Sequence, residues 1–197
     1  LNANKLQKSL NFVFGEKNLL VTFHPVTLEK GSSKLQMKEL LSALSELKKT
    51  HIIFTMPNAD PENEVIISMI KDFVKQHKNS KLFASLGQIR YLSTILYVDC
   101  VIGNSSSGLC EVPSFKKPTI NIGNRQKGRI KAESIIDCDP NKIEILKAIK
   151  KSYSDNFRRK LKSVKNPYDM GSASKKILKY LEMQEFTGSL NKSFIDL

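Results

Sequence analysis

Short apolar runs alternate along this chain with longer segments in which apolar residues recur every three or four positions. A run of four to six apolar residues is typical of a buried strand, and the longer spacing is typical of a helix with one buried face. Between residues 35 and 47, for example, Leu40, Leu44 and Leu47 fall on one helical face. The pattern predicts six strands, at residues 19–23, 51–55, 82–85, 100–102, 119–122 and 134–137.

Helical segments separate these strands. We expect helices at residues 35–47, 62–77, 89–97 and 172–183, a helix that begins near Ser106, and a helix that Asp139 caps with Pro140 in its first turn. Strands that alternate with helical crossovers are typical of a parallel, doubly wound sheet with helices on both faces. The sequence therefore predicts an α/β, three-layer, Rossmann-like fold in a single domain.

The composition is that of an ordinary globular protein, with 40% hydrophobic and 26% charged residues. No apolar run reaches the roughly 18 residues of a membrane-spanning helix, and the first residues do not resemble a signal peptide. The three cysteines have no CxxC spacing, which argues against a bound metal and against a disulfide framework. We therefore expect a cytoplasmic protein with no membrane partner and no metal.

The net charge of +13 comes mainly from lysines that are scattered along the chain. Nucleic-acid-binding proteins usually gather their positive charge on one face. We interpret the lysines as a solvated surface and expect no nucleic-acid partner, although the charge keeps a nucleic-acid-binding module open as an alternative.

Residues 101–129 carry the most specific chemistry, in the sequence VIGNSSSGLCEVPSFKKPTINIGNRQKGR. A strand that turns into a helix through small residues presents N–H groups to an anion such as a phosphate. The serines Ser105, Ser106 and Ser107 are candidates to contact a diphosphate, although they could serve only as a turn and a helix cap. Glu111 could accept hydrogen bonds from ribose hydroxyls. The segment is neither a Walker-type loop nor a GxGxxG motif.

Further candidate residues fall at the ends of other expected strands. His24 follows the first strand, Asn58 the second and Leu86 the third, while Arg125 and Arg129 follow the fifth. Because ligands of a doubly wound sheet bind outside the carboxyl ends of its strands, we expect one shared crevice. His24 could contact a phosphate or assist a leaving group, or simply cap the strand. Asn58 could be a turn residue only.

The motifs TFHPVTLE, MPNAD, IGNSSSGLCEVPSFKKPTINIG and NRQKGR resemble the carboxyl-terminal half of the hydrolysing UDP-N-acetylglucosamine 2-epimerases, from about residue 17 to 183. Such enzymes have two Rossmann-like domains that face each other across a cleft, the glycosyltransferase-B architecture. The resemblance implies that residues 1–18 are an interdomain segment, 19–183 a nucleotide-binding domain and 184–197 a C-terminal tail.

The resemblance also implies roles for single residues. Ser105, Ser106 and Glu111 match diphosphate- and ribose-contacting positions, and Leu86 matches a main-chain contact to the uracil. His24, Asn58 and Arg125 match contacts to the sugar nucleotide, with His24 the one catalytic candidate; Ser107 and Arg129 are weaker candidates. No cofactor is implied.

The implied reaction is elimination of UDP from UDP-N-acetylglucosamine, followed by hydration to N-acetylmannosamine, as in sialic-acid-type biosynthesis. The resemblance implies that the carboxylates of the acid–base steps lie in an amino-terminal domain, which would be the partner of this chain. For the whole enzyme, a homo-oligomer is expected. Three alternatives stay open: a 2-epimerase of GDP-linked or diacetamido sugars in legionaminic-type pathways, a glycosyltransferase, and a non-catalytic nucleotide-sugar-binding module.

Overall fold

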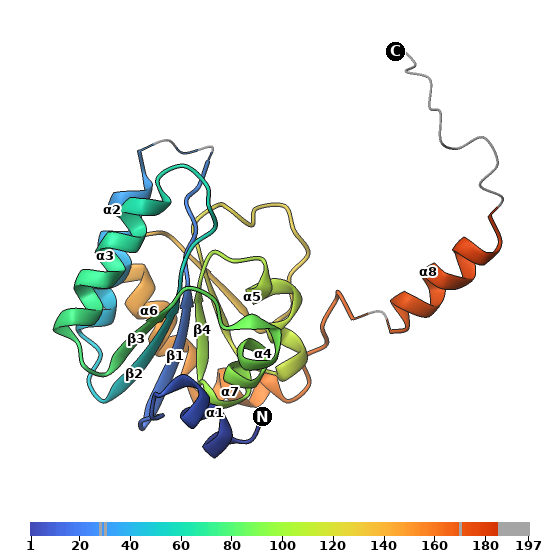
Figure 1. The fold of residues 1–197 in the computed structure, drawn as a ribbon, viewed down its shortest axis with the longest axis horizontal. Coiled ribbons are helices and arrows are strands. Elements are labelled where there is room, and N and C mark those ends of the chain that lie inside the picture. The colour runs from blue at the N-terminus through green and yellow to red at the C-terminus, as the bar shows by residue number, and fades with distance from the viewer. Residues whose placement is uncertain (28, 30, 170, 185–197) are drawn as a thin grey trace, which may run out of the picture. The chain divides into compact units, whose positions relative to one another are not determined.

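A six-stranded, all-parallel sheet forms the centre of the structure, a computed structural model that describes residues 1–27, 29, 31–169 and 171–184 (Figure 1). The strand order is β3-β2-β1-β4-β5-β6. The strands are β1 (Lys17–Thr22), β2 (Thr50–Thr55), β3 (Ser80–Phe83), β4 (Cys100–Gly103), β5 (Thr119–Ile122) and β6 (Ile135–Cys138). The predicted fold class, a doubly wound parallel α/β sheet of about six strands, is confirmed.

Helices bury both faces of the sheet. Successive strand residues point to opposite faces, so Leu20, Ile53 and Val101 enter one core while their neighbours along the strands enter the other. The larger core is closed by α2 (Ser33–Ser45), α3 (Asn63–Gln76), α6 (Lys142–Ser152) and α7 (Asp155–Leu161). The smaller core is closed by α1 (Ala3–Leu10), α4 (Gly87–Tyr97) and the 3-10 helix η1 (Val112–Phe115). Burial on both faces explains why the strands read as continuous apolar runs.

The strand order reverses between β1 and β4. From β1 the chain proceeds through β2 to β3 at one edge, and it then returns beside β1 to form β4. Ligands of open α/β sheets bind at such a switch point, outside the carboxyl ends of the strands. The loops that follow β1 and β4 are therefore the expected walls of a site.

Gly103 ends β4 at a very close approach to β1. Its φ is +141°, and a Cβ atom at this position would lie 1.9 Å from the carbonyl oxygen of Thr22. Only glycine has both the backbone freedom and the missing side chain that this contact requires. The residue thus brings the two strand ends at the switch point together.

Some elements differ from those expected. The N-cap of α6 is Asn141, whose Oδ1 accepts from the N–H of Glu144 at 3.0 Å, so the prediction that Asp139 caps this helix is wrong. Strand β3 begins at Ser80, two residues earlier than expected, and α1 and α7 were not expected. None of the described helices is long and apolar enough to cross a membrane.

The described chain divides into two units. The compact unit is Leu1–Pro167, and it includes α1, whose Leu6 and Leu10 are buried in the smaller core. The second unit begins at Tyr168 and holds α8 (Ala173–Glu182), which matches the last expected helix. Of the expected tail, only Gln184 lies within the described residues.

Candidate functional site

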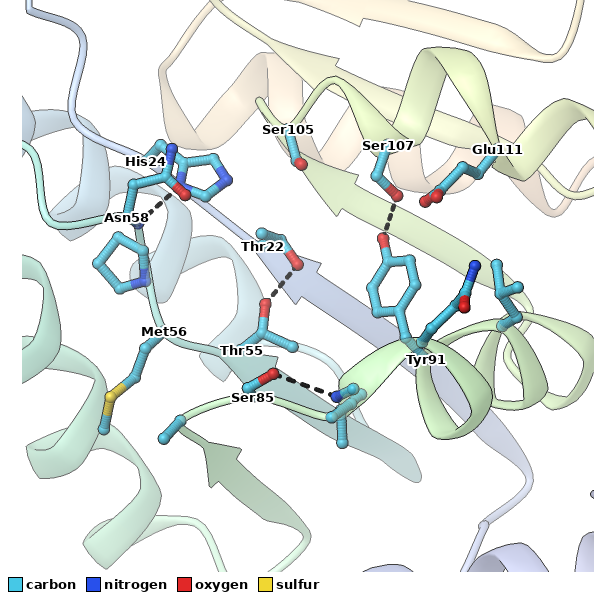
Figure 2. A pocket seen from close by; sticks show the side chains of 16 residues that line it. Thr22, His24, Thr55, Met56, Asn58, Ser85, Tyr91, Ser105, Ser107 and Glu111 are labelled. Carbon is cyan, nitrogen blue, oxygen red and sulfur yellow. Dashed lines mark hydrogen bonds between the residues drawn. The ribbon is translucent and has the colours of Figure 1, made fainter. Parts of the chain in front are cut away.

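A cavity of about 490 Å³ opens at the carboxyl edge of the sheet, at the switch point. Its lining comes from the last residues of β1 and β2, from the segments that follow all four strands β1 to β4, and from α4 and α5 (Ser107–Cys110). Figure 2 shows His24 and Asn58 on one side, Tyr91, Ser107 and Glu111 on the other, and Thr22 and Thr55 between them. Four strand ends thus converge on one crevice.

Six of the residues predicted from the sequence line this cavity: His24, Asn58, Leu86, Ser105, Ser107 and Glu111. Ser106, Arg125 and Arg129 are described by the structure but are not among the lining residues. Ser106 is the N-cap of α5, and Arg129 is exposed. Arg125 nevertheless lies close enough to His24 for its charge to act on the imidazole.

The hydrogen bonds of His24 define its chemical form. Its ring is buried, and Nδ1 accepts a hydrogen bond from the main-chain N–H of Asn58 at 3.0 Å. A nitrogen that accepts cannot carry a proton, so the neutral ring bears its proton on Nε2. His24 is therefore a hydrogen-bond donor through Nε2.

The surroundings of His24 also keep it uncharged. Burial, together with the positive charge of Arg125, lowers its pKa from 6.5 to about 4, although the Asp60 carboxylate acts in the opposite direction. Burial likewise lowers the pKa of Arg125, and Asp60 again opposes the shift. At neutral pH the site therefore presents one neutral imidazole beside one guanidinium cation.

Paired threonines form the floor of the cavity. Thr22 and Thr55 are register partners on β1 and β2, and their hydroxyl oxygens are 2.6 Å apart. Only one of the two protons is used in this bond, so the pair keeps one O–H for a further acceptor. Both residues occupy the last position of their strand, which is where a ligand of this fold would lie.

Tyr91 and Ser107 join α4 to the serine turn. Their hydroxyl groups are hydrogen-bonded, and burial raises the pKa of Tyr91, so the phenol stays protonated. The helix expected near Ser106 is α5, but it has only four residues and ends before Glu111. The dipole of so short a helix is small, so anion binding in this turn rests on hydroxyl and local main-chain groups.

Asn104 connects three loops of the site. Its side-chain Oδ1 accepts from the N–H of His24 at 2.7 Å, and its Nδ2 donates to the carbonyl of His24 at 2.8 Å. Its own carbonyl oxygen accepts from Arg125 at 3.2 Å and from the side chain of Gln126 at 2.8 Å. The loops after β1, β4 and β5 are thereby held together.

Leu86 contributes main chain rather than side chain. The residue is the N-cap of α4 and its side chain is buried in the smaller core. Its carbonyl accepts from Nε of Arg90 at 2.8 Å. A contact of Leu86 with a base would therefore be a main-chain contact, as the resemblance implies.

Several residues of the site were not identified from the sequence: Thr22, Thr55, Asp60, Tyr91, Asn104 and Gln126. The two threonines could have been found from their place at strand ends. Asn104 could not, because its partner His24 is 80 residues away in the chain. In the part of the chain that the structure describes, no three His, Cys, Asp or Glu side chains gather in a way that could hold a metal ion.

The sequence of this chain is similar to those of known proteins. Residues 1–182 match the family described as UDP-N-acetylglucosamine 2-epimerase. The chain is 40% identical, over its whole length, to a Campylobacter jejuni protein named GDP/UDP-N,N'-diacetylbacillosamine 2-epimerase (hydrolyzing), of which it covers 51%. It is 41% identical, over 92% of its length, to the polysialic acid biosynthesis protein P7 of Escherichia coli, of which it covers 46%.

Solved structures resemble the fold. The UDP-GlcNAc 2-epimerase of Neisseria meningitidis bound to UDP-GlcNAc aligns with a TM-score of 0.66 and 16% identity, over 92% of this chain and 48% of that one. The S. aureus MnaA–UDP structure aligns with a TM-score of 0.69 and 18% identity over the same shares. The chain spans about half the length of the curated relatives it matches. Because residues 1–182 match the family model, this chain belongs to the UDP-N-acetylglucosamine 2-epimerase family.

Proposed function

We propose that this chain is the nucleotide-binding half of a hydrolysing UDP-N-acetylglucosamine 2-epimerase. The observation that carries the proposal is the cavity at the β1–β4 switch point, where His24 keeps a proton on Nε2 and Arg125 supplies a positive charge nearby. A neutral donor beside a guanidinium suits a diphosphate group. Ser105, Ser106 and Ser107 extend the set of donors toward the phosphates, and Glu111 is suited to ribose hydroxyls.

In the whole enzyme, the sugar loses its C2 proton to a base while the bond between C1 and the UDP oxygen breaks. The product of this elimination is a glycal. Water then adds across the double bond, with hydroxyl at C1 and a proton at C2 from the opposite face, and N-acetylmannosamine is released. We assign to this chain the stabilisation of the departing diphosphate by His24 and Arg125. The acid and base are assigned to the facing domain, so the isolated chain binds UDP without turnover.

Calorimetric titration of this chain with UDP tests the proposal. We expect saturable binding of UDP, weaker binding of UMP because it lacks the second phosphate, and loss of affinity in His24→Ala. A matched control is His77→Ala, because His77 stacks on Phe73 in the α3 region and does not line the cavity. Absence of UDP binding at millimolar concentration would refute the assignment of this cavity to a nucleotide.

A second candidate is a 2-epimerase that acts on a GDP-linked or diacetamido sugar. It is favoured by the 40% identity to the Campylobacter jejuni protein, whose name contains both GDP and UDP and the diacetamido sugar N,N'-diacetylbacillosamine. The base would lie beside the main chain near Leu86, where Ser85 and Gln88 also line the cavity. Titration with GDP and UDP in parallel separates a GDP-linked from a UDP-linked substrate, since the preferred base binds more tightly.

The cellular setting is proposed on the same basis. We assign the whole enzyme to sialic-acid-type sugar biosynthesis in the cytoplasm, as a homo-oligomer in which the facing domain completes each site. The name of the Escherichia coli relative, a polysialic acid biosynthesis protein, supports the pathway. Light scattering on the full-length enzyme tests the oligomer, and a monomer with full activity would remove that part of the proposal.

A further inference from the structure

The side-chain amide of Asn104 is hydrogen-bonded to both polar groups of one main-chain residue. Oδ1 accepts from the N–H of His24 and Nδ2 donates to the carbonyl of His24. The side chain thus substitutes for a neighbouring strand at the point where β1 has ended. Asn104 is fully buried, so neither amide atom can exchange its partner for water.

The main chain of Asn104 makes further hydrogen bonds, to the end of β1 and to the loop after β5. Its N–H donates to the carbonyl of Thr22 at 3.2 Å, at the end of β1. Its carbonyl accepts from the guanidinium of Arg125 and from the Gln126 side chain. His24 and Arg125 lie 101 positions apart in the sequence, yet each is hydrogen-bonded to Asn104.

We propose that Asn104 is a positioning residue for nucleotide binding: its amide fixes the backbone of His24, and its carbonyl fixes the guanidinium of Arg125, so that both groups address one diphosphate. The inference rests on the proposed function of the cavity. Preorganised donors cost no reordering when the ligand arrives. Loss of Asn104 is therefore expected to weaken binding without removing any group that touches the ligand.

The same hydrogen bonds would be present if Asn104 only stabilised the fold. A matched control must therefore separate an effect on stability from an effect on binding. Asn18 provides one at the opposite end of β1. Its Oδ1 accepts from the N–H of Gly15 at 2.8 Å and its Nδ2 donates to the carbonyl of Gly15 at 3.0 Å, and it too is buried. Asn18 and Asn104 thus make the same kind of contact, one far from the cavity and one beside it.

The experiment compares Asn104→Ala and Asn18→Ala in the 197-residue chain. We expect both substitutions to lower the melting temperature, because each removes two hydrogen bonds between a buried amide and the main chain. We expect Asn104→Ala to weaken UDP binding by about fivefold to tenfold, the factor that corresponds to one neutral hydrogen bond, because the main chain of His24 is no longer held while the Asn104 carbonyl that binds Arg125 remains. Asn18→Ala is expected to bind UDP within about twofold of the unaltered chain.

A second readout reports on His24 itself. The chain has three histidines, so ¹⁵N-edited NMR can resolve each imidazole. Asn104→Ala should shift the ring signals of His24 and leave those of His51 and His77 in place, whereas Asn18→Ala should leave His24 unchanged. Should Asn104→Ala fail to fold, Asn104→Asp replaces it: the aspartate can still accept from the His24 N–H but cannot donate to the His24 carbonyl, and its charge should raise the titration midpoint of His24.

The outcomes separate this inference from the proposed function. If the Asn104 variants bind UDP as tightly as the unaltered chain and their His24 signals are unchanged, the positioning role is overturned. Equal weakening by Asn18→Ala and Asn104→Ala would also overturn it, because the effect would then follow from lost stability. If the unaltered chain fails to bind UDP, the proposed function falls, and the His24 signals alone still decide whether Asn104 positions the imidazole.

Discussion

The main-chain N–H of Asn58 donates to Nδ1 of His24 across 3.0 Å, so the loop after β2 determines which nitrogen of this imidazole keeps the proton. Protonation of His24 would require this hydrogen bond to break, because imidazolium has no acceptor. Burial and the charge of Arg125 oppose protonation as well. Residues from two different loops therefore keep His24 neutral.

The first prediction concerns pH. The pKa of His24 is about 4 in the folded chain, whereas its ordinary value, which applies to the unfolded chain, is 6.5. Between these two pH values the unfolded state therefore binds more protons than the folded state. The free energy of unfolding should therefore fall as the pH is lowered from about 6.5 towards 4. Urea denaturation of His24→Gln should show a weaker pH dependence in this window than the unaltered chain. Identical pH dependence of the two proteins would contradict the neutral, buried state of His24.

The second prediction concerns Arg125. Arg125→Ala should weaken UDP binding by about tenfold or more, because a charged hydrogen-bond donor is lost from the anion site. Arg125→Lys should retain part of the affinity, since the charge remains but the planar fork does not. Calorimetry on this chain measures both, with Arg159→Ala as the control because Arg159 is an exposed arginine of α7. If the Arg159 and Arg125 variants bind UDP alike, Arg125 has no part in the site.

The third prediction concerns the threonine pair. Thr22→Val and Thr55→Val should each destabilise the fold by about 1–3 kcal/mol, because each leaves the other hydroxyl buried without its partner. The double variant should cost clearly less than the sum of the two, since no unpaired hydroxyl remains. Chemical denaturation of the four proteins gives the coupling energy, and simple additivity would show that the hydroxyl pair is not an energetic unit.

The fourth prediction concerns Gly103. Gly103→Ala should destabilise the fold by about 3 kcal/mol or more, because it combines backbone strain with a Cβ placed against the Thr22 carbonyl. Gly128→Ala is the control, since Gly128 also has a positive φ, of +82°, but open space around its Cα. That substitution should cost about 1 kcal/mol. Similar melting temperatures for the two variants would mean that the β1–β4 contact can relax.

The sequence predicted most of the fold because its signals are local. Runs such as Leu19–Phe23 are apolar on both sides of the strand, as a sheet covered by helices on both faces requires. The sequence reading misses helix α1, although Leu6 and Leu10 lie four positions apart and Asn2 is a suitable cap; that residues 1–18 form an interdomain segment stays a prediction. The predicted α6 cap, Asp139, lies two residues before the observed cap, Asn141. Both residues are suitable caps, and only the geometry distinguishes them.

The sequence predicts a residue of the candidate site only where that residue lies just after the end of a predicted strand. His24, Asn58 and Ser105 come within three residues of the ends of β1, β2 and β4, and each lines the cavity. Ser106 and Arg125 are not among the residues that line the cavity, and their contact with a ligand stays a prediction. The roles of Asn104 and Asp60 depend on partners from other loops, and a single sequence does not contain those pairings.

The reversal of strand order at β1 and β4 also governs when the site can form during folding. Strands β1, β2 and β3 follow one another with short crossovers, whereas pairing of β1 with β4 closes a loop of about 80 residues, and such long loops carry a larger entropic cost. A folding intermediate that holds only β1–β3 would have His24 without its contacts to Asn104. The ability to bind nucleotide should therefore appear with the last long-range pairing, so that ligand stabilises only chains that have completed the sheet.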